Sequence, residues 1–75
     1  MTLTELKYLV ALDSERHFGR AADRSFVSQP TLSVALRKLE DELELKLFER
    51  VGHDRMALTD GGRALYAFCR AFFEG

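Results

Sequence analysis

Residues 28–37 carry side-chain types that can read a nucleic acid. An amide can pair with adenine, a guanidinium can reach guanine or a phosphate oxygen, and hydroxyl groups can donate to bases or phosphates. Val34 is a β-branched apolar residue on the solvent side of the helix expected here, where it could lie against a thymine methyl group. The candidate DNA contacts of this segment are Gln29, Thr31, Ser33, Val34 and Arg37.

Basic residues outside this segment are candidate contacts to phosphate. The formal net charge is -1, but residues 16–38 hold five basic residues against one acidic residue, and residues 39–49 hold five acidic residues against one basic residue. This segregation favours one face that meets a polyanion and another that is turned away, although charge blocks also serve solubility. The further candidates are Arg20, near the start of a short helix, and Arg50, His53 and Arg55, in an expected hairpin.

Catalysis, metal binding and cofactor binding find no support in the sequence. There is no Ser-His-Asp set at a plausible spacing, no glycine-rich loop for phosphates and no cofactor motif. The single cysteine, Cys69, cannot form an intrachain disulfide, and His17 and His53 do not complete a metal site with it. Its place on an apolar helical stripe indicates a packing residue. We therefore expect neither an enzyme nor a protein with a metal or cofactor.

Hydropathy gives no sign of a membrane or secretory segment. No apolar run approaches the roughly 20 residues that a membrane-spanning helix needs. Residues 1–12 do not read as a signal peptide, because Glu5 and Lys7 interrupt their apolar residues. The sequence predicts a cytoplasmic protein without membrane contact.

Three helices should position the candidate residues. Thr2 and Glu5 stand at capping-box spacing before periodic leucines, which predicts a first helix over about residues 3–15. A short second helix over residues 18–25 contains two alanines that let another helix cross closely. A third helix over residues 28–43 begins at the N-cap Ser28, and its leucines form one stripe that faces the core. These leucines are Leu32, Leu36, Leu39 and Leu43.

The order of elements predicts a mainly α fold, the winged helix-turn-helix. This fold has a three-helix core, a two-stranded wing and here a C-terminal linker or dimerisation helix, which Thr59 or Asp60 could cap at its start and Gly75 at its end. We expect a DNA-binding domain over residues 1–58, with helix 28–43 in the major groove and wing 47–58 on the backbone or minor groove. Residues 59–75 should form the first part of the linker helix. Its apolar residues extend beyond one face, which indicates that another helix packs against it.

The sequence of residues 17–50, together with the LT at 58–59, resembles the signature of LysR-type transcriptional regulators. Residues 17–50 read HFGRAADRSFVSQPTLSVALRKLEDELELKLFER. Within that family HFGRAAD, VSQPTLS and RKLEDEL are most similar to the peroxide-sensing, OxyR-like branch. The resemblance implies sequence-specific binding of double-stranded operator DNA and regulation of transcription, including an oxidative-stress response. It also implies a homodimer through helix 59–75, a possible further assembly into a tetramer, RNA polymerase as a candidate partner, and an effector domain outside this chain.

Site residues follow from the same resemblance. Many family members carry arginine at position 34, so a base contact of that kind does not transfer to Val34. The turn positions that are commonly leucine and a polar residue are Ser25 and Phe26 here, and we expect Phe26 to fill the space that Ser25 leaves. The DNA contacts that the resemblance implies are Gln29, Pro30, Thr31, Ser33 and the wing residue Arg50.

One competing class uses the same fold without DNA. A winged-helix protein-docking module would explain the near-neutral net charge, and it would bind a partner through the apolar residues Val34, Phe72 and Phe73. Affinity for DNA separates the two classes.

Overall fold

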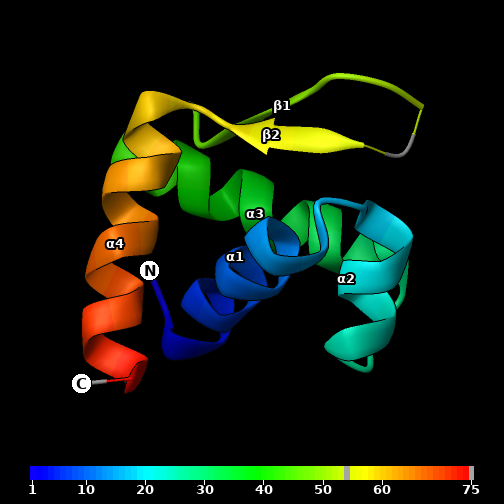
Figure 1. Ribbon diagram of the computed structural model, residues 1–75, viewed down its shortest axis with the longest axis horizontal. Coiled ribbons are helices and arrows are strands. Elements are labelled where there is room, and N and C mark those ends of the chain that lie inside the picture. Colours follow the sequence, from blue (N-terminus) through cyan, green and yellow to red (C-terminus); the bar gives the residue numbers. More distant parts are fainter. Residues whose placement is uncertain (54, 75) are drawn as a thin grey trace.

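The computed structural model describes residues 1–53 and 55–74, and the turn residue Asp54 and the expected C-cap Gly75 lie outside the described residues. The two strands pair antiparallel in register Phe48 with Leu58 and Arg50 with Met56. Helices α1, α2 and α3 pack together, the wing projects above them, and α4 runs along one side (Figure 1). The mainly α winged helix-turn-helix expected from the sequence is therefore confirmed. Its elements are α1 (Leu3–Glu15), α2 (Phe18–Arg24), α3 (Gln29–Leu43), β1 (Phe48–Arg50), β2 (Met56–Leu58) and α4 (Asp60–Glu74).

Side-chain caps fix where the helices begin. Thr2 and Glu5 form the expected capping box at α1. Ser28 caps α3, because its hydroxyl oxygen accepts the Thr31 N–H at 3.2 Å. The Thr59 hydroxyl accepts a backbone N–H of the first turn of α4 at 3.1 Å. These caps satisfy N–H groups that lack a partner within the helix, so short local sequences decide the starts of three helices.

The core lies where α1, α2 and α3 meet. Leu32, Leu36 and Leu39 of the predicted stripe are completely buried. The fourth leucine, Leu43, is only half-buried. It is the last residue of α3, and the chain turns away at Glu44, which has a left-handed backbone with φ 53°. The stripe prediction is thus confirmed for three leucines and wrong for the fourth.

The turn between α2 and α3 corrects a second expectation. Phe26 does not fill space beside Ser25, since its side chain is 94% exposed. The Phe26 N–H donates to the Asp23 carbonyl at 3.1 Å, and the Val27 N–H donates to the Ala22 carbonyl at 3.0 Å. These bonds end α2 with Phe26 in the left-handed region, at φ 59°. That backbone conformation directs the phenyl ring into solvent.

Replacing Phe26 by glycine is expected to raise the free energy of unfolding by about 1 kcal/mol. A residue with a Cβ pays roughly 1–2 kcal/mol in the left-handed region, whereas glycine adopts it freely. Urea denaturation followed by circular dichroism measures the change. Phe26→Ala is the control, because it removes the ring and keeps the Cβ, and it should leave the stability within about 0.5 kcal/mol. Equal stabilisation by both variants would contradict the backbone explanation.

Helix α4 packs against α1 and leaves aromatic side chains exposed to solvent. Cys69 is completely buried, whereas Phe68 and Phe72 are 57% and 64% exposed. Burial raises the pKa of the Cys69 thiol. The protonated thiol is a weak nucleophile, so Cys69 has the packing role that its stripe predicts. Within the described residues, no helix is long and apolar enough to cross a membrane.

Candidate nucleic-acid interface

The N-terminal half of α3 presents the predicted contact residues to solvent. Because Leu32 and Leu36 are buried, the residues on the opposite side of the helix must point outward. Ser33 is half-buried at the edge of this face, and Val34 is 65% exposed. The structure therefore brings the α3 candidates together on one accessible surface. These residues are Gln29, Pro30, Thr31, Ser33, Val34 and Arg37.

The cap of α3 leaves one hydroxyl ready to donate. The Ser28 hydroxyl donates to the Thr31 hydroxyl oxygen at 2.9 Å. The Thr31 side chain is exposed, and its own hydroxyl proton can still be given to a base or phosphate. The cap thus orients Thr31 without using its donor.

The wing is tied to the start of α2. His17 forms an isolated antiparallel bridge with Arg55, and its Nδ1 accepts the Arg20 N–H at 3.2 Å. The side chains of Arg20, His53 and Arg55 are exposed. Three phosphate candidates that lie far apart in the sequence are therefore borne by two elements in contact with each other. The sequence did not single out the His17 bridge that joins these elements.

Arg50 is held against an aromatic ring. Its Cζ lies 4.6 Å from the centroid of the Phe18 ring, and its Nη1 donates to the His53 carbonyl at 3.4 Å. Phe18 is 2% exposed, so the ring is fixed by the core. The sequence marked Arg50 but missed this contact, although both residues belong to the motifs FxRAA and LFER.

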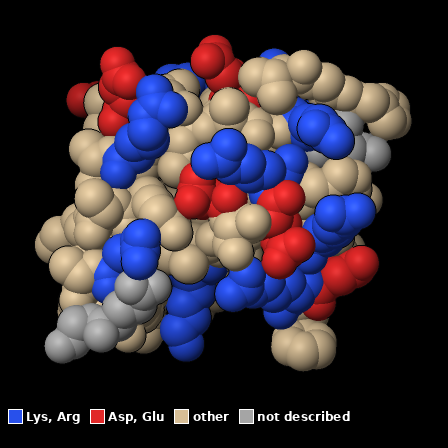
Figure 2. Space-filling model, in the orientation of Figure 1, with Lys and Arg blue, Asp and Glu red and all other residues tan. Residues whose placement is uncertain are grey.

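Charges of both signs lie side by side on one face of the molecule (Figure 2). Figure 2 shows basic and acidic side chains interspersed over the face that it draws. Arg24 pairs with Glu15 at 3.3 Å, and the α-amino group of Met1 pairs with Glu42. Such pairs offset part of the charge counted in the sequence.

Comparison with known proteins shows which protein family this chain belongs to. A winged helix-turn-helix with an exposed polar recognition face defines a class of DNA-binding domains. The family model "Bacterial regulatory helix-turn-helix protein, lysR family" matches residues 3–63. The chain belongs to this family.

Relatives of known role and structure agree with that assignment. The chain is 52% identical over 65 residues to the DNA-binding transcriptional dual regulator OxyR of Escherichia coli K12, covering 87% of this chain and 21% of that protein. It is 53% identical to full-length OxyR of Pseudomonas aeruginosa, with a TM-score of 0.89 over 99% of this chain and 25% of that one. The BenM DNA-binding domain in complex with catB site 1 DNA is 34% identical, with a TM-score of 0.91 over 99% of this chain and 82% of that one. The expected similarity to OxyR-like regulators is confirmed, and the chain spans about a fifth of the length of these regulators.

Proposed function

We propose that this chain is the sequence-specific DNA-binding domain of a LysR-type transcription regulator and has no enzymatic activity. The observation that carries the proposal is the exposed polar face of α3 on a fold that matches a domain solved with bound DNA. Helix α3 occupies the major groove, where Gln29 and Val34 meet base edges. The wing lies on the adjacent backbone or minor groove, where Arg50, His53 and Arg55 meet phosphates.

The functional unit is a homodimer joined through residues 59–75. The exposed Phe68 and Phe72 on α4 support this assignment, because aromatic residues at a helix surface are stabilised by a partner helix. Residues 1–58 then form the reading domain. A dimer addresses two half-sites one or more helical turns apart. In the whole protein we further propose a cytoplasmic location, assembly to a tetramer and contact with RNA polymerase.

A peroxide response is the regulatory role that the similarities favour. Regulators described as hydrogen peroxide-inducible genes activators are 51–52% identical to this chain, whereas the RuBisCO operon transcriptional regulator is 38% identical. The domain that would sense the signal is outside the compared region, so this role belongs to the whole protein.

Selection from a pool of random duplexes tests the proposed function. The native chain should enrich an inverted repeat, since the operator mirrors the symmetry of the dimer. Gln29→Ala should relax the preference at one base pair of each half-site, because it removes an amide that pairs with a base edge. Arg50→Ala should weaken all sequences alike, because it removes a phosphate contact. Absence of any enrichment, even from a forced dimer at low salt, would contradict the proposal and favour the protein-docking module.

A further inference from the structure

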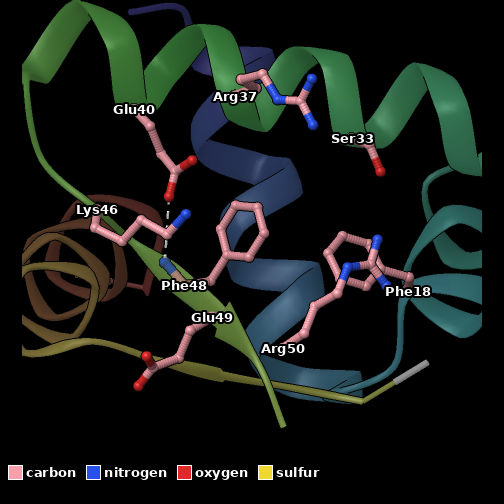
Figure 3. Close-up of a pocket in the computed structure, with 8 residues that line it drawn as sticks. All are labelled: Phe18, Ser33, Arg37, Glu40, Lys46, Phe48, Glu49 and Arg50. Carbon is pink, nitrogen blue, oxygen red and sulfur yellow. Dashed lines mark hydrogen bonds between the residues drawn. The ribbon is translucent and has the colours of Figure 1, made fainter. Parts of the chain in front are cut away.

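A polar cleft separates α3 from β1 (Figure 3). Its floor is formed by the rings of Phe18 and Phe48, which meet edge to face with their centroids 5.6 Å apart. Ser33 and Arg37 come to it from α3, and its volume is about 190 Å³. The other basic residues that line it, Lys46 and Arg50, precede and end β1. Three cationic side chains therefore surround one small space.

Two of these cations have no partner among the residues that the structure describes. Within the described part of the chain, the side chains of Arg37 and Lys46 form neither an ion pair nor a hydrogen bond. Both side chains are exposed at the rim of the cleft. Figure 3 shows the Arg37 guanidinium extending from α3 over the cleft. Their charges are available to an anion from outside.

The two acidic residues that line the cleft, Glu40 and Glu49, only partly offset its three cations. The Glu40 carboxylate accepts the Leu47 N–H at 2.8 Å and the Phe48 N–H at 3.4 Å, so it serves the backbone at the start of β1. Figure 3 shows the Glu49 carboxylate pointing away from α3, on the other side of the strand. Three cations against two carboxylates leave the cleft with a net positive formal charge.

Stacking on Phe18 prepares Arg50 to donate. A guanidinium over an aromatic face keeps its N–H groups in its own plane, pointing away from its centre, where they can reach an oxygen at its edge. Because Phe18 is fixed in the core, the stack limits the rotamers that the long Arg50 side chain adopts. Less conformational entropy is then lost when Arg50 binds an anion.

We propose that this cleft binds one backbone phosphate of DNA, contacted by Ser33, Arg37, Lys46 and Arg50, with Phe18 as the positioning residue for Arg50. The proposal rests on the proposed function. With α3 in the major groove and the wing on the adjacent backbone or minor groove, the sugar-phosphate strand that divides the two grooves must pass between α3 and β1. The cleft lies at that crossing, and its chemistry suits a phosphate group.

The salt dependence of binding tests the phosphate site. The affinity for a random-sequence duplex is measured by fluorescence anisotropy between 50 and 200 mM salt for the native chain, Arg37→Gln and Lys46→Gln. Each variant should lower the slope of log affinity against log salt by a part of about 0.9, the value of one whole phosphate contact, because the two side chains share the same phosphate. Lys7→Gln is the matched control, because Lys7 is exposed in a different groove, between α1 and the end of α2. Unchanged slopes for both cleft variants would overturn the phosphate site.

A double-mutant cycle tests the positioning role of Phe18. Arg50→Gln should weaken binding about tenfold, and Phe18→Leu about threefold when Arg50 is present. In the Arg50→Gln background, Phe18→Leu should leave the affinity unchanged, although it still lowers the melting temperature. Equal losses in both backgrounds would overturn the positioning role. The exposed variants above need no change in the core, so the test of the cleft stands even if Phe18→Leu does not fold. A native chain with no salt-dependent affinity for DNA would instead overturn the proposed function itself.

Discussion

Replacing Gly62 by alanine is expected to lower the free energy of unfolding by about 3 kcal/mol or more, or to prevent folding. A Cβ on Gly62 would overlap the carbonyl oxygen of Leu47 and lie 2.9 Å from its carbonyl carbon. Both are backbone atoms, and the same carbonyl accepts the Thr59 N–H at 3.0 Å. Relief of the overlap therefore requires α4 to move away from the segment that begins the wing.

The neighbouring glycine supplies a matched control for this prediction. A Cβ on Gly61 would lie 3.5 Å from the Lys46 carbonyl oxygen, which is ordinary van der Waals contact. Gly61→Ala should therefore keep the fold and gain up to about 1 kcal/mol from the higher helix propensity of alanine. Urea denaturation followed by circular dichroism compares the two variants. Similar stabilities of Gly61→Ala and Gly62→Ala would show that α4 does not approach Leu47 as closely as described.

Opposite consequences are expected for two residues of α3 that lie two positions apart. Leu36 is completely buried, so Leu36→Ala should cost about 3 kcal/mol or more through lost burial and the cavity that remains. Val34 is 65% exposed, so Val34→Ala should change the free energy of unfolding by less than about 0.5 kcal/mol. In the selected DNA, however, Val34→Ala should weaken the preference for thymine at the position that Val34 contacts.

Denaturation and DNA selection together check this pair. Leu36→Ala should change mainly the stability and Val34→Ala mainly the base preference, because the stripe that includes Leu36 packs the core and the face that includes Val34 meets the groove. A loss of stability from Val34→Ala as large as that from Leu36→Ala would contradict the orientation of α3.

Local sequence predicted the parts of the fold that local interactions decide. Ser28 caps α3 through a bond to a residue three positions later, so the start of α3 could be read directly from the text. The periodic leucines likewise gave the buried face of α3. Leu43 deviates because burial at the end of a helix depends on what packs beyond it, which periodicity does not report.

The features that the sequence did not predict depend on contacts that form only in the folded chain. Phe26 takes a left-handed backbone because the bonds that end α2 require it, against the preference of its own side chain. The stack of Arg50 on Phe18 joins residues far apart in the chain. The close approach of Gly62 to the backbone of Leu47 likewise arises only when α4 packs against the start of the wing. For the candidate site, residue types and helical phase predicted which side chains are exposed on α3, and their contacts with DNA stay predictions.

Chemical-shift mapping of the backbone amides during titration with a duplex tests the central claim most directly. We expect the largest changes on residues 29–37 of α3 and on the wing near Arg50 and His53, with smaller changes on the exposed side of α1 that carries Lys7. Raising the salt concentration should reduce these changes together, because phosphate contacts supply much of the affinity. Largest changes on α4 near Phe72, or no changes at low salt, would contradict the assignment of α3 and the wing as the DNA-binding surface.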